Sequence, residues 1–237
     1  MRLGTRVDPA LLAAGAYDDI VIATGIVPRR PPISGIDAPH VLSYVDVLRG
    51  APVGRRVAVI GAGGIGFDVS EFLLHHEGEP LPLPRDGWLD EWGVDLSVRE
   101  RGGLKPPAPA RPPRQIWLLQ RKAGKLGAGL GKTSGWVHRA TLARNGVKML
   151  AGVSYLEISQ RGLKIARDGV EEWLEVDNIV VCAGQESLRD LHPRESAQEK
   201  PADAGGPRYH VIGGAALATE LDAKRAIREG AELAARL

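Results

Sequence analysis

The chain has 237 residues, of which 43% are hydrophobic and 25% are charged, so it can bury a core and form one large domain or two small ones. Its net charge of only +2 argues against a nucleic-acid partner, and it shows neither an apolar run long enough to span a membrane nor a secretory signal. We therefore expect a cytoplasmic protein, and the lone Cys182 excludes a disulfide, a cysteine-rich zinc site or an iron–sulfur cluster held within this chain.

Short apolar runs, several closed by glycine, predict the strands of a buried parallel sheet, as in an α/β fold. In chain order, the predicted strands cover residues 19–23, 56–60, 115–119, 147–150, 178–182 and 210–212. Apolar residues at helical spacing predict helices over residues 43–48, 67–76, 136–144 and 217–237, the first opened by a capping box of Ser43 and Asp46. The last helix carries a predicted apolar stripe of Leu217, Leu221, Ile227, Ala231 and Ala234.

Two segments depart from this alternation of strands and helices. Residues 153–177 contain three short strands separated by glycine-containing turns, which predict an antiparallel β-meander. Residues 77–114 hold eight of the 17 prolines and predict an insertion between two regular elements rather than an element of its own. Trp88 and Trp92 lie within this insertion and indicate that it packs on another part of the chain.

The strongest functional motif is the glycine-rich sequence Gly61-Ala62-Gly63-Gly64-Ile65-Gly66, which follows a predicted strand and opens a predicted helix. In a dinucleotide-binding fold the first glycine allows the tight turn, the second lets the backbone approach a pyrophosphate, and the third lets helix and strand pack closely. The helix N-terminus then offers free N–H groups to the phosphates. The motif therefore predicts a nucleotide cofactor; the alternative is a glycine-rich turn of an ordinary α/β domain.

The residues that end the next predicted strand should read the adenosine ribose of such a cofactor. Gln120, Arg121 and Lys122 stand there, so the position offers two cations and no carboxylate. Cations pair with the 2′-phosphate of NADP, whereas an acidic residue binds the ribose of NAD, so we predict NADPH. The alternative is a solvated basic turn, and the prediction requires the long insertion to loop out between the two strands.

Two other predicted strands end in small residues and glycine. One is followed by Ala23, Thr24 and Gly25, and the other by Ala183 and Gly184. Such strand ends indicate two related halves that each approach a ligand closely, and plain strand-ending turns are the alternative.

No catalytic residue and no metal ligand is assigned from the sequence. Residues 127–133 are similar to a phosphate loop, but Leu126 stands where that motif requires glycine, which argues against nucleotide hydrolysis. Lys132 in this segment is a further candidate for holding a 2′-phosphate. His75 and His76 are adjacent on a predicted helix and do not face one another, so they do not predict a metal site.

Taken in order, five segments closely resemble one family. They read YDDIVIATGIVPR, GAGGIGFD, GKTSGWVHR, DNIVVCAGQE and VIGG, and they are spread over nearly the whole chain. The series resembles the C-terminal part of bacterial NADPH-dependent 2,4-dienoyl-CoA reductases, which are multi-domain flavoproteins related to trimethylamine dehydrogenase and old yellow enzyme.

This resemblance implies an NADPH-binding domain, residues 50–185 with the insertion 77–114, nested in a partial FAD-binding domain formed by residues 1–49 and 186–237. It implies that the pyrophosphate of NADPH faces the glycine-rich turn, with Arg121 and Lys122 at its 2′-phosphate. The full set of predicted cofactor-binding residues is Ala23, Thr24, Gly25, Gly61, Gly63, Gly64, Ile65, Gly66, Arg121, Lys122, Ala183, Gly184, Gly213 and Gly214, of which the last two would lie at the flavin.

The family also has an N-terminal barrel with FMN and the dienoyl-CoA site, a cysteine cluster for iron–sulfur, and a first glycine fingerprint for FAD, and this sequence contains none of them. We therefore expect the part of a flavin-dependent oxidoreductase that passes a hydride from NADPH to FAD. It is either a fragment or one piece of a split enzyme whose partner carries the barrel and the cluster. The alternatives are a non-catalytic NADP(H)-binding module, a partner subunit that completes another protein's FAD site, and an inert gene fragment.

Overall fold

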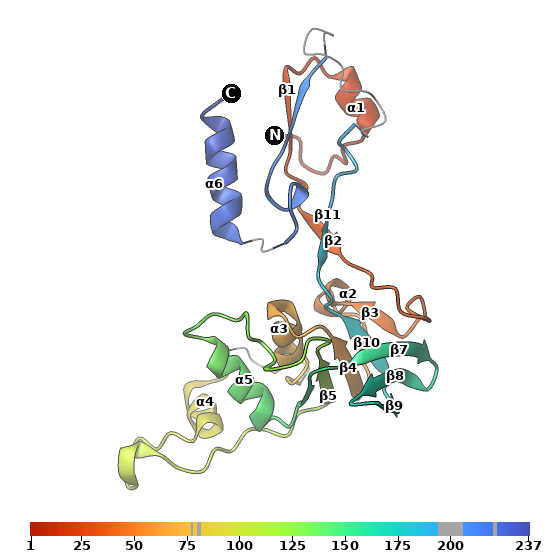
Figure 1. The fold of residues 1–237 in the computed structure, drawn as a ribbon. Coiled ribbons are helices and arrows are strands. Elements are labelled where there is room, and N and C mark those ends of the chain that lie inside the picture. The colour runs from red at the N-terminus through yellow and green to blue at the C-terminus, as the bar shows by residue number, and fades with distance from the viewer. Residues whose placement is uncertain (77, 80–81, 194–205, 220–221) are drawn as a thin grey trace. The chain divides into compact units, whose positions relative to one another are not determined.

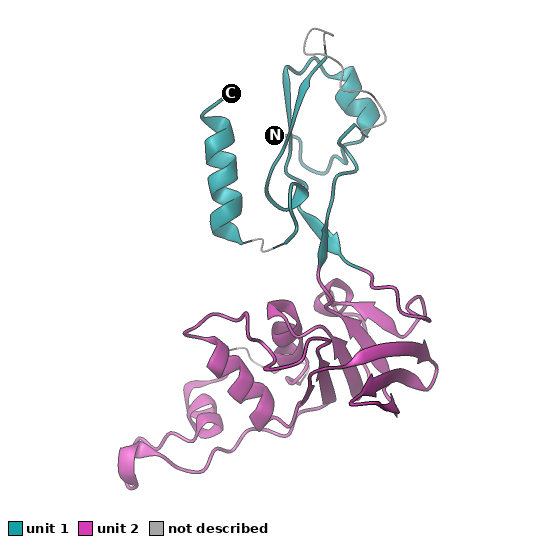
Figure 2. Cartoon of the chain, viewed as in Figure 1, with its two compact units in different colours: residues 1–29, 185–237 teal, residues 30–184 magenta. Residues whose placement is uncertain are grey.

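The computed structural model describes residues 1–76, 78–79, 82–193, 206–219 and 222–237. These residues form two compact units, unit 1 (residues 1–29 and 185–237) and unit 2 (residues 30–184), each described here by itself (Figure 2). The units divide between Arg29 and Arg30 and between Gly184 and Gln185, and the domain limits that the resemblance implies stay a prediction. Which cofactor each predicted domain holds stays a prediction.

The centre of unit 2 is a five-stranded sheet in which every strand is parallel to its neighbours (Figure 1). In spatial order its strands are β3 (Val41–Ser43), β10 (Asn178–Val181), β4 (Arg56–Ile60), β5 (Gln115–Leu119) and β6 (Lys148–Leu150). Four of them were predicted from apolar runs, and β3 was missed. The predicted α/β fold with a parallel sheet is confirmed.

Alternate residues of β4 enter two different core clusters, one on each face of the sheet. Val57 and Val59 belong to one cluster, Ala58 and Ile60 to the other, and all four are 0% exposed. A strand covered on both faces has no polar side, which is why the sequence of β4 is a continuous apolar run.

Helices cover one face of this sheet and the predicted meander covers the other. The helices are α2 (Tyr44–Leu48), α3 (Gly64–Phe72) and α5 (Gly135–Arg144), and all three place side chains in the same cluster as Val57. The meander strands are β7 (Ser154–Ser159), β8 (Gly162–Arg167) and β9 (Val170–Leu174), which contribute to the second cluster. The predicted capping box opens α2, since Asp46 N donates to Ser43 Oγ at 3.1 Å and Ser43 N donates to Asp46 Oδ2 at 2.8 Å.

The insertion is not devoid of regular structure, so that prediction was wrong. It contains α4 (Arg85–Trp92), which ends at Gly93 in the left-handed conformation, φ 71°. The prediction that its tryptophans pack on another part of the chain is right for Trp92, whose ring lies 6.3 Å from that of Trp136 on α5 and 4.3 Å from the Arg144 guanidinium. Trp88 is 49% exposed, and its ring contacts Trp92 within the insertion. Pro80 and Leu81 of the insertion lie outside the described residues.

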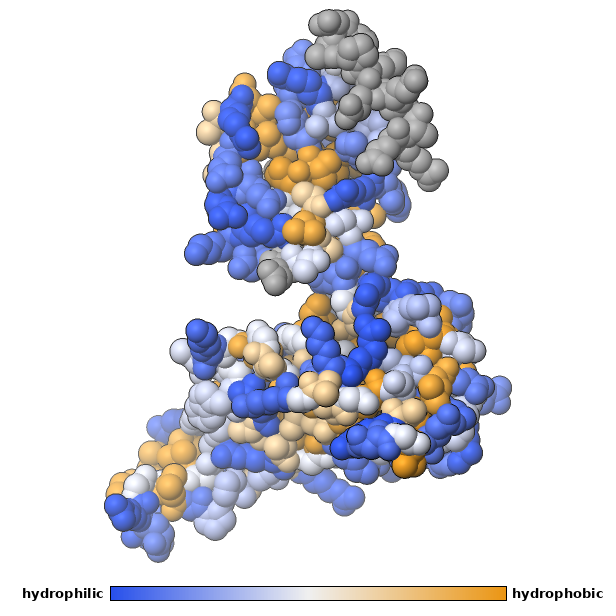
Figure 3. All heavy atoms as spheres, in the orientation of Figure 1, coloured by the Kyte–Doolittle hydropathy of each residue, from blue (hydrophilic) through white to orange (hydrophobic). Residues whose placement is uncertain are grey.

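Beyond α4 the insertion carries exposed apolar side chains. Leu96 and Val98 are each 66% exposed and Leu104 is 61% exposed. Figure 3 shows hydrophobic surface at the projecting end of unit 2 formed by this part of the chain.

The described residues of unit 1 form two separate pairs of short strands and two α-helices. The parallel pair is β1 (Asp19–Ile22) with β12 (Arg208–Val211), and the antiparallel pair is β2 (Ile26–Pro28) with β11 (Gln185–Ser187). The helices are α1 (Pro9–Ala14) and α6 (Ala223–Ala234). The core cluster among its described residues comprises Ile20, Ile22 and Ala215.

The C-terminal helix begins six residues later than predicted, because Asp222 caps it: its Oδ1 accepts a hydrogen bond of 2.7 Å from Arg225 N. The predicted apolar stripe is not a buried face, since Ile227 is 71% exposed and Leu217, which precedes the helix, is 54% exposed. Leu221 lies outside the described residues. Within the described ranges no helix is both long and apolar enough to cross a lipid bilayer.

Candidate functional site

The glycine-rich turn joins the carboxyl end of β4 to the amino end of α3. Gly61 has a φ of +108°, and a Cβ there would lie 2.4 Å from Cys182 O, while a Cβ on Gly66 would lie 1.8 Å from Gly61 O. Only glycine fits at these two positions. Gly61 is required by its left-handed backbone conformation and by the close neighbouring strand, and Gly66 by the close packing of the helix on the turn. These are the structural roles expected of the first and last glycine of a dinucleotide fingerprint.

The middle glycines of the turn face open space instead. No atom lies within 4 Å of a Cβ built on Gly63 or Gly64, and both residues are exposed. The N–H groups in the first turn of α3 have no acceptor within the helix, and no side chain caps them. Ile65 packs its side chain on the core and offers only its backbone to this space. The turn therefore fits an anion such as a pyrophosphate, held by backbone N–H groups.

The basic strand end lies beside this turn, because β5 pairs directly with β4: Leu119 is opposite Ile60, and Gly61 N donates to Leu119 O at 3.0 Å. The insertion loops out between the two strands, as the NADPH prediction requires. Arg121 and Lys122 are exposed, and neither forms an ion pair with a carboxylate of the described residues.

Local contacts hold this basic turn in place. The backbone oxygen of Lys122 accepts from Gln120 Nε2 at 2.9 Å and from Gly152 N at 3.2 Å. Arg121 lies near the phenol of Tyr155, whose pKa burial raises far above its usual value while the nearby cation opposes that rise. The two side chains thus leave a fixed backbone at the carboxyl edge of the sheet and are free to reach an anion.

A third strand end completes this edge. Cys182 N donates to Ile60 O at 2.8 Å, which places Ala183 and Gly184 next to Gly61 as the chain leaves β10. Burial raises the pKa of the Cys182 thiol to about 12. A neutral buried thiol acts as a small core residue.

The segment similar to a phosphate loop packs on α3. A Cβ on Gly127 would lie 2.8 Å from the Phe67 ring, and Gly127 O accepts from Arg139 Nη1 at 3.1 Å. Lys132 is exposed in this segment. The close contact explains the glycine at position 127 without any phosphate.

A second candidate site lies in unit 1, at the carboxyl ends of β1 and β12. A pocket of about 370 Å³ brings together four predicted residues, Ala23, Gly25, Gly213 and Gly214. Thr24 is not among its lining residues, since its hydroxyl donates to Leu188 O at 2.5 Å. The volume is at the lower end of the usual range for ligand sites, about 300–1,000 Å³.

Two acidic residues of this second site were missed from the sequence. Asp222 lines the pocket as the N-cap of α6, and Glu229 Oε2 accepts from Gly213 N at 2.5 Å. An aspartate just before a helix is a recognisable N-cap signal, whereas nothing in the sequence brings Glu229 to Gly213.

Comparison with known proteins assigns the fold to a family. The chain belongs to the pyridine nucleotide-disulphide oxidoreductase family, whose model matches residues 12–206. It is 25% identical over 182 residues to a metal reductase of Desulforamulus reducens, an alignment that covers 75% of this chain and 26% of that protein. Members of the family bind a pyridine nucleotide and FAD, and both are expected here.

Solved structures with the same fold are longer chains, of which this chain matches a part. A 2-naphthoyl-CoA reductase in complex with 2-naphthoyl-CoA matches with a TM-score of 0.70 at 23% identity, covering 100% of this chain and 29% of that one. Histamine dehydrogenase from Rhizobium sp. 4-9 matches with a TM-score of 0.65 at 16% identity, covering 98% and 32%. The chain thus spans less than a third of each of these proteins.

Proposed function

We propose that this chain is the pyridine-nucleotide part of a flavin-dependent reductase, in which residues 50–185 bind NADPH and residues 1–49 and 186–237 form part of an FAD site. The observation that carries the proposal is the turn from Gly61 to Gly66, which is closed to any side chain at its ends and open at Gly63 and Gly64. The N–H groups at the start of α3 bind the pyrophosphate there. When bound, the cofactors supply the chemistry, a hydride passing from NADPH to FAD, and no side-chain acid or base is needed.

Selectivity for NADPH over NADH rests on Arg121 and Lys122, with Lys132 as a third cation. The support for Arg121 and Lys122 is their exposure at the end of β5, the strand next to β4, and the lack of a carboxylate partner among the described residues. The support for Lys132 is its exposure alone. Guanidinium and ammonium groups form charge-assisted hydrogen bonds with a phosphate, and NADH offers none at this position.

The reductase we propose resembles the 2,4-dienoyl-CoA reductases, with residues 50–185 as the NADPH domain and residues 1–49 and 186–237 as parts of the FAD domain. Its substrate would be an unsaturated acyl-CoA of fatty acid β-oxidation. Support comes from the motifs shared with that family and from the fold shared with a 2-naphthoyl-CoA reductase. The centre that reduces the substrate would lie on a longer chain or on a partner carrying the barrel and the iron–sulfur cluster.

The test is a calorimetric titration of the full chain with NADPH and, separately, with NADH at constant salt. Arg121→Ala should weaken NADPH binding about tenfold, because one charge-assisted hydrogen bond to phosphate is lost, and leave NADH binding unchanged. Arg99→Ala, which removes an exposed arginine of the insertion, is the matched control and should change neither. Equal affinity of the wild type for both cofactors, or an equal loss for both in Arg121→Ala, would refute the assignment.

A non-catalytic NADP(H)-binding module is the second candidate, because unit 2 by itself contains both the glycine-rich turn and the basic strand end. Visible flavin absorbance that bleaches on addition of NADPH supports the enzyme part. A colourless protein that still binds NADPH supports the module.

A further inference from the structure

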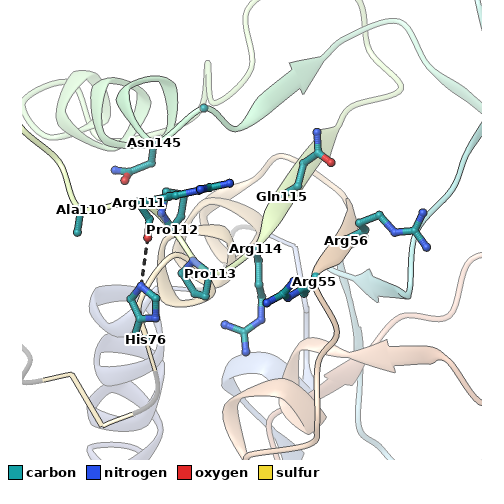
Figure 4. Close-up of a pocket in the computed structure, with 11 residues that line it drawn as sticks. Arg55, Arg56, His76, Ala110, Arg111, Pro112, Pro113, Arg114, Gln115 and Asn145 are labelled. Carbon is teal, nitrogen blue, oxygen red and sulfur yellow. Dashed lines mark hydrogen bonds between the residues drawn. The ribbon is translucent and has the colours of Figure 1, made fainter.

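Unit 2 has a large basic cavity that the cofactor assignment does not use. It lies at the amino ends of β4 and β5, where Arg55 and Arg114 immediately precede the two strands, and its volume is about 1040 Å³ (Figure 4). The glycine-rich turn follows the carboxyl end of β4, so the length of a five-residue strand, roughly 16 Å at about 3.3 Å per residue, separates the two places.

The cavity has an excess of positive charge. Four arginines line it, Arg55, Arg56, Arg111 and Arg114, and no acidic residue does so among the described ones. Arg56 is neutralised outside the cavity lining, because its Nη2 lies 2.8 Å from Asp177 Oδ1. The other three form no ion pair within the described part of the chain. Three cations around one opening repel each other unless an anion lies between them.

One of these arginines also has an unsatisfied donor. Arg114 Nη1 donates to Leu73 O at 3.1 Å, but its Nε is buried and has no hydrogen-bond partner. Buried donors in folded proteins nearly always have an acceptor, so the side chain of Arg114, which lines the cavity, keeps one donor that no described residue satisfies.

The arginines come from segments that are held together. Arg111 O accepts from His76 Nε2 at 3.1 Å, which ties the end of the insertion to the segment after α3. Pro112 and Pro113 stiffen the chain between the two arginines and give the cavity an apolar wall. The site is therefore shaped by fixed backbone and not only by long side chains.

We propose that this cavity binds a small anion carrying two or more phosphate groups, separately from the NADPH site. Guanidinium groups match pairs of phosphate oxygens better than any other side chain does. Three uncompensated cations call for a ligand with more than one negative charge. The volume exceeds what a single phosphate needs and equals the upper range of small-molecule sites. An inorganic chain of phosphates and the phosphate chain of a nucleotide share this chemistry.

The experiment is calorimetric titration of the full chain with inorganic pyrophosphate and, in a separate arm, with ATP. Arg55→Gln/Arg111→Gln should weaken pyrophosphate binding about tenfold or more, since two charge-assisted contacts are lost. Both side chains are exposed and form no side-chain hydrogen bond with any described residue, so the variant should fold, which thermal unfolding checks. Arg101→Gln, an exposed arginine elsewhere in the insertion, is the matched control and should bind like the wild type.

Three further arms separate this site from the cofactor site. Saturating NADPH and the variant Arg121→Ala should each leave pyrophosphate binding intact, and amide exchange of residues 108–114 should slow when pyrophosphate binds. Tighter binding of ATP than of pyrophosphate identifies a nucleotide as the ligand, and equal binding identifies the phosphates alone. Displacement by NADPH, equal binding of citrate, or no saturable pyrophosphate binding would overturn the proposal.

Discussion

Units 1 and 2 both end apolar strands in glycine, yet they secure those strands in different ways. In unit 2, β4 lies between two strands and is 0% exposed from Val57 to Ile60, with a separate core cluster on each face. In unit 1, β1 pairs with β12, and its Val21 is 43% exposed between the buried Ile20 and Ile22. Similar strand ends can therefore be presented by a scaffold with a large core or by one with a small core. Only in the large core of unit 2 is the strand held by buried contacts on both of its faces.

The largest effects should come from removing core side chains in each unit. Leu118→Ala removes a side chain that is 0% exposed in the first cluster of unit 2, and it should lower the free energy of unfolding of that unit by about 2–5 kcal/mol. Ile22→Ala in unit 1 should cost nearer the lower end, about 2 kcal/mol, because a small core can collapse around the cavity. Urea unfolding, monitored by amide hydrogen exchange, measures the loss in free energy of unfolding in each unit.

The two losses should also be local. Amides of β4 and β5 should lose protection in Leu118→Ala, and those of β1 and β12 in Ile22→Ala, because Leu118 and Ile22 belong to separate core clusters. Equal loss of protection throughout the chain in either variant would mean that the two cores unfold as one.

A smaller effect on stability, and a large one on binding, should separate two glycines of the same turn. Gly66→Ala forces a Cβ to within 1.8 Å of Gly61 O, so it should lower stability by about 1–3 kcal/mol and abolish NADPH binding. Gly64→Ala places its Cβ in open space, so stability should be unchanged while NADPH binding weakens. Thermal unfolding and cofactor titration give the two readouts, and undiminished NADPH affinity in Gly64→Ala would place the pyrophosphate elsewhere.

The sequence was most informative where a residue type has one physical use. Gly61 and Gly66 could be assigned roles in advance because a left-handed turn and a close strand–helix approach each exclude a side chain. Continuous apolar runs likewise predicted β4, β5 and β10, since a strand covered on both faces needs no polar residue.

Other features depend on contacts between distant segments. Spacing alone could not show that β5 pairs with β4 across the insertion, nor that Arg55, Arg111 and Arg114 line one cavity. The helix α4 was missed because glycine and surrounding prolines hide its short apolar pattern. The three residues of β3 are too few to show a period in the sequence. They form a strand because they pair with β10 at the edge of the sheet.

The smallest expected effect is the pH dependence of stability that comes from one ion pair in each unit. In unit 1, hydrogen bonds from Arg208 and then His210 hold the pKa of Asp19 below its usual value; in unit 2, hydrogen bonds from Arg56 do the same for Asp177. A carboxyl group whose pKa is lower in the folded state stabilises that state above its unfolded pKa, about 3.9, and loses this contribution as the pH falls through the folded value. Asp19→Asn and Asp177→Asn should therefore each destabilise the protein at pH 7, and the difference from wild type should shrink as the pH falls below about 4 and vanish only below the lowered pKa of the folded state.

Salt should distinguish the two pairs. The Asp19 side chain is 19% exposed and that of Asp177 is 36% exposed, so ions screen the second pair more effectively. Raising the ionic strength to about 1 M should thus shrink the effect of Asp177→Asn more than that of Asp19→Asn. Asp37→Asn, whose 84% exposed side chain pairs with Arg30, is the control and should be neutral at every pH. If Asp19→Asn instead proved the more salt-sensitive variant, the Asp19 ion pair would be more open to solvent than the burial of its carboxylate indicates.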